Sequence, residues 1–226
     1  MVKVLELFSG TGSVGKCCKE LGWEVVSVDM ILPADHKCDI MDFDYKQYDK
    51  DEFDIVWGSP PCQSYSVLQN TWKGRMRNGK IFTQDDIDNM MNEADKLVLK
   101  TFEIIDYFKP ELWFVENPAT GNLKNRDIMK DISFYDVSYC MYSDWGYEKK
   151  TRIWTNKKDW NNLICDKSGK CGNMIENKKH RVNMSKDIGC GSQKNQPKDL
   201  KFLGKGTNRI DRYRVPSDLI YSLFLD

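Results

Sequence analysis

The chain has 226 residues, with 34 Lys and Arg balanced by 34 Asp and Glu, and this length holds one α/β domain with a small appendage. No apolar run approaches the roughly 18 residues that a membrane span needs, and no secretory leader precedes the first predicted strand. We therefore expect no membrane contact, a cytoplasmic setting, and eight cysteines that are reduced thiols.

The zero net charge conceals an uneven distribution along the chain. Residues 1–148 carry 16 Lys and Arg against 26 Asp and Glu, whereas residues 149–214 carry 18 against 6. A basic segment on an acidic body is typical of a nucleic-acid contact surface. A Lys-rich loop that serves only solubility gives the same counts, so this alternative stays open at this point.

The first elements predict a cofactor site. Residues 2–8 alternate like a strand, and the turn Ser9-Gly10-Thr11-Gly12 follows at once, before a helix to about Leu21. Glycines let a backbone turn tightly and approach a ligand, but this pattern does not separate a dinucleotide from S-adenosylmethionine. Residues 24–28 predict a second strand ending at Asp29, where a carboxylate can accept both ribose hydroxyls. Cys38-Asp39-Ile40 then predicts a short strand or a turn.

The most informative stretch is residues 53–66, in which an apolar run breaks at Gly58 and continues as Pro60-Pro61-Cys62-Gln63. This pattern predicts a buried parallel strand followed by a rigid turn, because proline fixes φ and lacks a backbone N–H. The thiol would lie at the carboxyl end of the strand, where open α/β sheets bind their ligands. A structural cysteine in a proline-rich turn is the alternative.

A polar stretch at residues 64–82 follows the turn and predicts a mobile loop that closes on a polyanion, or else a plain surface loop. Its basic residues are Lys73, Arg75, Arg77 and Lys80. Thr83 and Asp86 then form a capping box for a long helix that ends near Lys109.

A second buried strand at 112–115 delivers Glu116 and Asn117 to the same edge of the sheet as Cys62. A lone glutamate at a strand end is usually structural, but beside a nucleophilic thiol it has a catalytic use. The remaining predicted elements are strands at 134–142 and 151–156 and a helix that ends at Leu225.

Three motifs in this order resemble those of the cytosine carbon-5 DNA methyltransferases, in a short viral, phage or bacterial form. They are Phe-Ser-Gly-x-Gly at 8–12, Pro-Pro-Cys-Gln at 60–63 and Glu-Asn at 116–117. The resemblance implies an α/β fold with a Rossmann-like, S-adenosylmethionine-dependent methyltransferase sheet and helices on both faces.

The resemblance also implies an organisation in three parts. Residues 1–155 would form the catalytic and cofactor-binding domain, and residues 156–209 a small, irregular, basic target-recognition insert. Residues 210–226 would form a helix that packs back on the catalytic domain. We expect a monomer that acts on double-stranded DNA.

The implied reaction moves a methyl group from S-adenosylmethionine to carbon 5 of a flipped-out cytosine. Cys62 would attack carbon 6, a protonated Glu116 would donate to ring nitrogen 3, and Arg152 would bind the ring carbonyl. The residues implied to bind the cofactor are Phe8, Ser9, Gly10, Thr11, Gly12, Asp29, Met30, Asp39, Ile40 and Pro60.

Two residues depart from the family's Gln-x-Arg-x-Arg segment: Glu148 replaces the glutamine and Lys150 the first arginine, while Arg152 matches the second. These departures motivate one alternative, a catalytically decayed nucleic-acid-binding protein. A tRNA cytosine-5 methyltransferase is the other alternative, because that branch shares the Ser-Pro-Pro-Cys-Gln string.

The predicted insert offers a candidate metal site and two candidate guanine-reading residues. Three thiols and one imidazole can bind zinc in a tetrahedral arrangement. A segment this polar has too few apolar residues for a core of its own and would need a bound metal or a similar cross-link for stability. No Cys-x-x-Cys spacing occurs, so unligated cysteines are the alternative. The candidate ligands are Cys165, Cys171, His180 and Cys190. Arg181 and Arg209 would read guanine through their bidentate guanidinium groups.

Overall fold

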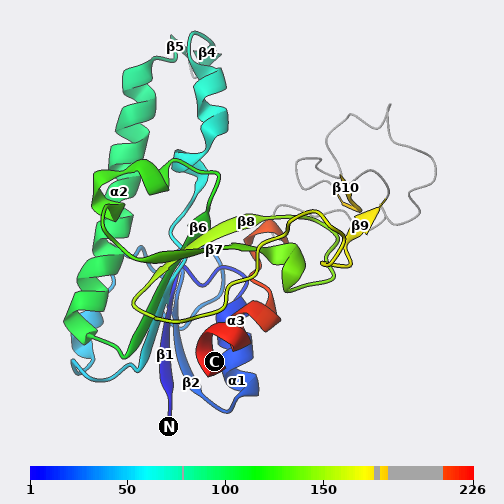
Figure 1. The fold of residues 1–226 in the computed structure, drawn as a ribbon. Helices are drawn as coiled ribbons and strands as arrows, with labels where there is room; N and C mark the ends of the chain where they lie inside the picture. The colour runs from blue at the N-terminus through cyan, green and yellow to red at the C-terminus, as the bar shows by residue number, and fades with distance from the viewer. Residues whose placement is uncertain (78, 176–178, 183–210) are drawn as a thin grey trace.

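The computed structural model describes residues 1–77, 79–175, 179–182 and 211–226, and its centre is a six-stranded sheet (Figure 1). The strand order is β2-β1-β3-β6-β8-β7. The strands are β1 (Lys3–Leu7), β2 (Glu24–Val28), β3 (Ile55–Gly58), β6 (Leu112–Pro118), β7 (Phe134–Ser138) and β8 (Lys150–Thr155). Of the site predictions, Cys190 and Arg209 lie outside the described residues.

Strands β1, β2, β3 and β6 run parallel, whereas β8 runs antiparallel to both β6 and β7. The carboxyl ends of the four parallel strands therefore meet at one edge of the sheet, together with the beginning of β8. In open sheets this edge is where ligands bind.

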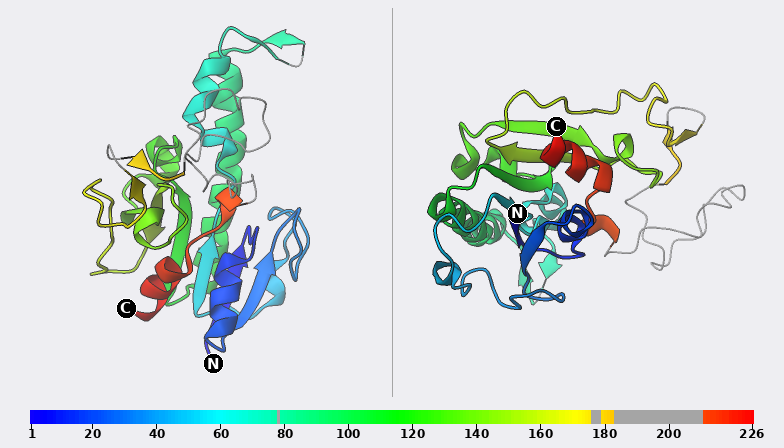
Figure 2. Two further views of the ribbon diagram at one scale, coloured as in Figure 1. Left: turned by 90° about the vertical axis from the view of Figure 1, so that its right-hand side faces the viewer. Right: turned by 90° about the horizontal axis from the view of Figure 1, so that it is seen from below.

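Helices cover both faces of the sheet, as the predicted fold class requires (Figure 2). They are α1 (Ser13–Glu20), α2 (Gln84–Phe108) and α3 (Ser217–Leu225). Neighbouring side chains of β1 point to opposite faces, so Val4 packs with α1 and α3 while Leu5 packs with α2. The predicted capping box at the start of α2 is present, since Thr83 and Asp86 bond each other's backbone N–H.

The smaller elements lie outside the sheet. The far end of α2 reaches beyond the sheet edge and carries a hairpin of β4 and β5 (Figure 1). The short strands are β4 (Met76–Arg77), β5 (Lys80–Ile81), β9 (Met174–Ile175) and β10 (Lys179–His180). The 3₁₀ helices are Tyr45–Gln47, Gln63–Tyr65, Val67–Trp72, Leu123–Asn125, Asp127–Met129, Tyr139–Met141 and Asp211–Tyr213.

The structure gives regular elements to the stretch 64–82, for which the sequence predicts a loop, and a turn at 38–40, which is one of the two predicted alternatives. The stretch 64–82 is built of 3₁₀ helices and the β4–β5 hairpin, because Gly74 N and Phe82 N donate to backbone carbonyls across the hairpin. At 38–40 the chain turns, since Asp39 Oδ1 accepts from Met41 N at 2.9 Å. The alternative of a third strand there is therefore wrong.

A buried carboxylate fixes α1 against β1. Glu6 is only 3% exposed, and its two oxygens accept from Val14 N at 3.2 Å and Gly15 N at 3.0 Å. These N–H groups belong to the first turn of α1, where intrahelical partners are missing. A Cβ at Gly15 would lie 2.8 Å from Glu6 Oε2, so only glycine permits this approach. Burial raises the pKa of Glu6 to about 7, although both N–H groups oppose the shift.

This raised pKa predicts that folding stability falls as the pH rises from about 4.5 to 7. In that window the folded state binds a proton that the unfolded state releases, and the full effect is on the order of 3 kcal/mol. The Glu6→Gln variant cannot titrate, so its free energy of unfolding should vary less with pH than that of the wild type. Urea unfolding at several pH values measures this, with exposed Glu111→Gln as the control. Equal pH dependence in all three proteins would contradict the prediction.

Candidate active site

The turn that carries Cys62 is held from two sides. On β6, Asn117 Nδ2 donates to Pro60 O at 2.9 Å. On α2, Asp95 Oδ1 accepts from the Tyr65 hydroxyl at 2.9 Å. Asn117 and Tyr65 are both buried, so these bonds are shielded from water. The thiol is thereby fixed at the carboxyl edge of the sheet, as the sequence predicts.

Glu116 lies near the end of β6 and is 6% exposed. Its Oε1 accepts from the Tyr139 hydroxyl at 3.0 Å and from Lys149 Nζ at 3.3 Å. Lys149 is itself 8% exposed and donates to the carbonyl of Arg212 at 3.2 Å. A buried glutamate is therefore paired with a buried lysine that immediately precedes β8.

Three groups at this edge influence one another electrostatically. Burial raises the pKa of the Cys62 thiol above its usual value, and the negative charge of Glu116 adds to this effect. The positive charge of Lys149 opposes it. Lys149 therefore favours the thiolate of Cys62 while it binds Glu116, which places the three side chains in one site.

The structure does not bring Arg152 to Glu116. In β8, Arg152 lies opposite Asn117 of β6 and Asp136 of β7, whereas Ile153 lies opposite Glu116. Because side chains alternate between the faces of a sheet, Arg152 and Glu116 point to opposite faces.

Arg152 has partners of its own on that opposite face. It binds Asp136 through two hydrogen bonds of 2.7 and 2.9 Å, and its guanidinium lies 3.5 Å from the centre of the Phe134 ring. Sequence reasoning missed Lys149. The usable signal was the alternation of Lys149, Thr151 and Ile153 on the Glu116 face.

The segment before α3 passes along the site and contacts three other parts of the chain. Tyr213 accepts from Gln63 Nε2 at 3.0 Å, and the Arg212 carbonyl accepts from Lys149 as described. Val215 N donates to Ser13 Oγ of α1 at 3.2 Å. The C-terminal segment therefore contacts the nucleophile turn, the buried lysine and the start of α1.

The predicted cofactor residues gather at the neighbouring strand ends. Asp29 Oδ2 accepts from Gly10 N at 2.9 Å, and Oδ1 accepts from the backbone N–H groups of Ile31 and Leu32. Asp29 therefore links the glycine turn after β1 to the turn after β2. Each carboxylate oxygen can accept more than one hydrogen bond, so Oδ2 still has room for a ligand hydroxyl.

The glycine turn itself has an unusual backbone. Gly10 and Gly12 have positive φ angles, and Phe8 has φ 56, which is uncommon for a residue with a side chain. Ser9 N donates to Val28 O at 3.0 Å, and the Thr11 hydroxyl lies 3.0 Å from that of Ser13. Strained positions of this kind cluster at ligand sites.

The predicted adenine contacts divide into an exposed and a buried group. Met30 is 58% exposed beside Asp29, which leaves its side chain accessible to a ligand. Ile40 is buried in the core under α2, and Asp39 closes the turn that precedes Met41.

The residues predicted to contact DNA differ in exposure and in the partners they already have. Lys73, Arg75 and Lys80 are exposed at or beside the β4–β5 hairpin, and Lys80 pairs with Asp86. Arg77 belongs to β4, but its side chain is not described. Arg181 Nη2 donates to Asn173 Oδ1 at 2.9 Å, so one arm of its guanidinium group already has a partner.

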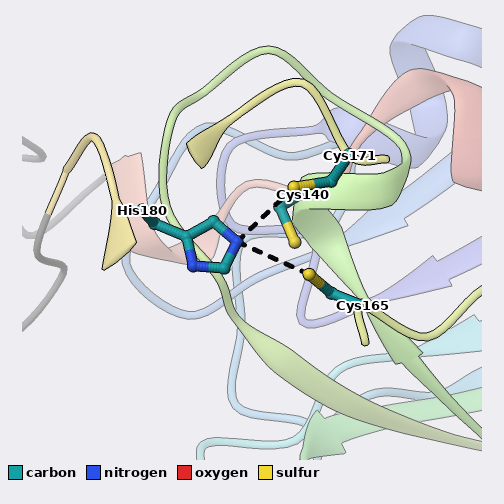
Figure 3. Close-up of side chains that lie close together, drawn as sticks. All are labelled: Cys140, Cys165, Cys171 and His180. Atoms are coloured by element: carbon teal, nitrogen blue, oxygen red, sulfur yellow. Dashed lines mark hydrogen bonds between the residues drawn. The ribbon is translucent and has the colours of Figure 1, made fainter. Parts of the chain in front are cut away.

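Three of the four predicted metal ligands come together with a fourth residue that was not predicted. Cys165, Cys171 and His180 lie with Cys140, which directly follows Tyr139 (Figure 3). Cys140 comes from the catalytic part of the chain, and no sequence spacing marks it as a ligand. Among the described residues, no helix is both long and apolar enough to cross a membrane.

Comparisons with known proteins identify the family of the chain. The family model for C-5 cytosine-specific DNA methylase matches residues 29–153. A probable DNA (cytosine-5)-methyltransferase of Frog virus 3 (isolate Goorha) is 36% identical over 227 residues, which cover 98% of each chain.

Solved structures with similar folds are more distant in sequence. The Entamoeba histolytica methyltransferase EhMeth aligns with a TM-score of 0.49 and 18% identity, over 73% of this chain and 56% of its own. Dnmt2 methyltransferase of S. pombe aligns with a TM-score of 0.46 and 14% identity, over 83% and 61%. The chain thus spans less than two thirds of these solved chains. The matching family model and the viral relative confirm the resemblance seen in the motifs, and the chain belongs to the C-5 cytosine-specific DNA methylases.

Proposed function

We propose that the chain transfers a methyl group from S-adenosylmethionine to carbon 5 of cytosine in double-stranded DNA. The observation that carries this proposal is the grouping of Cys62, Glu116 and Lys149 at the carboxyl edge of the sheet. The family and the name of the viral relative support DNA as the substrate. That the chain works as a monomer stays a prediction.

Cytosine carbon 5 is a weak nucleophile and needs covalent activation. The Cys62 thiolate forms a bond to carbon 6, and the electron pair of the ring double bond moves toward nitrogen 3, which takes a proton. S-adenosylmethionine, when bound, supplies the methyl group that carbon 5 then attacks. The methyl donor would leave as S-adenosylhomocysteine, and nitrogen 3 returns its proton to the Glu116 carboxylate. Loss of the carbon-5 proton to a base or water, with departure of the thiolate, then restores the ring. Cys62 has the rigid placement that this addition and elimination require.

Glu116 is proposed to protonate ring nitrogen 3. Both of its hydrogen bonds within the described residues end on Oε1, so Oε2 is the oxygen left for the base. A carboxyl group that presents one oxygen to a ring nitrogen serves as a general acid when protonated.

Lys149 is proposed for the role that sequence reasoning gave to Arg152. An ammonium group has three donors, and two of them reach Glu116 Oε1 and the Arg212 carbonyl. The third can bind the carbonyl oxygen of the cytosine ring. This arrangement accounts for the lysine at position 150, because the cation that faces the site stands one residue earlier.

S-adenosylmethionine is proposed to lie along the glycine turn and Asp29. The positive-φ glycines allow a close approach of the backbone, and Asp29 Oδ2 can accept one ribose hydroxyl. Met30 is exposed at the same edge and offers an apolar surface to the adenine ring.

DNA is proposed to contact the β4–β5 hairpin, which directly precedes α2. Lys73 and Arg75 are exposed there, on a part of the molecule that projects beyond the sheet edge (Figure 1). Phosphate contacts of this kind make the affinity for DNA fall steeply with salt. The logarithm of the binding constant decreases against the logarithm of the salt concentration with a slope of about −0.9 per contact.

The covalent step gives a direct test of Cys62. In 5-fluorocytosine a fluorine atom replaces the proton that carbon 5 must lose before Cys62 can be released. The protein therefore stays covalently bonded to carbon 6 of the base. We expect a denaturation-resistant adduct on a long duplex substituted at every cytosine. Wild type and the Cys38→Ser control should form it, and Cys62→Ser should not. An adduct with Cys62→Ser would refute the assignment, and an adduct on 5-fluorocytidine tRNA alone would make RNA the substrate.

The neighbouring lysines give a matched test of the proposed cation. Lys149→Met should lower activity by about 100-fold or more, since a charge-assisted bond lost in the transition state costs about 3 kcal/mol. The rate should rise with pH as the Cys62 thiolate forms. In Lys149→Met this rise should occur at higher pH, because Lys149 lowers the pKa of Cys62. Lys150→Met should leave the activity and the pH profile nearly unchanged, since the Lys150 side chain is exposed and its Nζ lies 3.8 Å from Glu148 Oε1. The same pH profile in both variants would contradict this role.

Asp29→Asn should weaken S-adenosylmethionine binding by about 10-fold or more, as expected when a hydrogen bond to a charged group is lost. Isothermal titration calorimetry measures the dissociation constant. Asp35→Asn is the matched control, because Asp35 lies in the same loop and accepts from Ser27 N at 2.9 Å. Equal binding by wild type and Asp29→Asn would remove Asp29 from the proposed cofactor site.

A further inference from the structure

Four side chains with soft or borderline metal-ligand atoms converge outside the active site (Figure 3). Their sulfur and ring-nitrogen atoms all lie within 4.8 Å of one another. The Sγ atoms of Cys165 and Cys171 are each 3.7 Å from Nε2 of His180. The fourth member is Cys140, which is buried.

The two sulfur-to-nitrogen distances of 3.7 Å are close to the edge length of a tetrahedron around zinc, and the 4.8 Å limit on the other pairs allows a small contraction onto the ion. Bonds of about 2.3 Å to sulfur and about 2.0 Å to nitrogen place the ligand atoms about 3.5–3.8 Å apart. Three thiolates and one imidazole form one of the usual zinc ligand sets, and soft thiolates disfavour magnesium or calcium. Four protein ligands leave no open position, so such a site is structural.

Surrounding hydrogen bonds hold the ligands in place. The buried amide Nδ2 of Asn173 donates to the carbonyl of Cys140 at 2.8 Å and to that of Cys171 at 2.9 Å. Outer contacts of this kind orient metal ligands. Asn173 Oδ1 accepts from Gly146 N at 3.0 Å, so the same residue also fixes the loop that leads to Lys149.

We propose that Cys140, Cys165, Cys171 and His180 bind one Zn²⁺ ion that fastens the target-recognition insert to the catalytic domain. Cys140 lies in the 3₁₀ helix Tyr139–Met141 after β7, whereas the other three ligands belong to the insert. Tyr139, the neighbour of Cys140, donates to Glu116. The ion therefore joins the insert to the turn that supports the catalytic carboxylate. Cys190, proposed as a ligand from sequence, is not needed to complete the set.

Metal content gives a test that is independent of methyl transfer. Protein purified without chelator should contain about one zinc per chain, and cobalt exchanged into the site should show the absorption of tetrahedral thiolate ligation. Cys140→Ser and Cys165→Ser should release zinc to a chelator that the wild type resists. Cys38→Ser and Cys190→Ser are the matched controls and should behave like the wild type.

A second measurement guards against a variant that fails to fold. Far-ultraviolet circular dichroism should show that Cys140→Ser keeps the helices, and hydrogen exchange on wild-type protein with added chelator should increase within residues 165–175 but not in α2. Protein without zinc, zinc retained by a folded Cys140→Ser, or zinc lost from Cys190→Ser would each overturn the proposed set. Disulfide bonds among the three cysteines under reducing purification would do so as well.

Discussion

The arrangement of the active site depends on a buried ion pair between Glu116 and Lys149. Removing two charges from water costs several kcal/mol for each ion, and this cost is offset only when good geometry and further hydrogen bonds stabilise the pair. Here Tyr139 and the Arg212 carbonyl complete the pair. The four residues come from β6, the turn after β7, the start of β8 and the segment before α3. The ion pair and its hydrogen bonds therefore link four distant parts of the chain.

Two successive residues of strand β6 have different roles at the site. Glu116 points toward the face covered by α1 and α3 and meets Lys149, whereas Asn117 binds the backbone of Pro60 and fixes the nucleophile turn. A shift of one residue in the pairing of β6 would exchange these directions, since neighbouring side chains of a strand face opposite sides. The register of the sheet is therefore a condition for the chemistry as well as for packing.

Burial raises the pKa of the Cys62 thiol, which disfavours the thiolate that the reaction needs. Burial opposes the charge, Glu116 adds to the opposition, and Lys149 counters it. Glu116 must take up a proton to act as an acid, and once that proton has passed to the base its carboxylate is again the charged partner of Lys149. One lysine thus acts on both reacting groups, which explains why a chain without the usual arginine at position 150 retains a complete set of polar partners.

The sequence by itself determined the elements whose signals are local. The Pro-Pro turn placed Cys62, the apolar run before Glu116 placed that residue at a strand end, and Thr83 with Asp86 marked the start of α2. The tertiary structure alone decided which side chains meet across strands. It put Lys149 rather than Arg152 beside Glu116, and it brought Cys140 to the cysteines of the insert. The physical reason is that strand register and crossing connections depend on pairing between distant segments, whereas a turn or a helix cap is set by residues that adjoin in the chain.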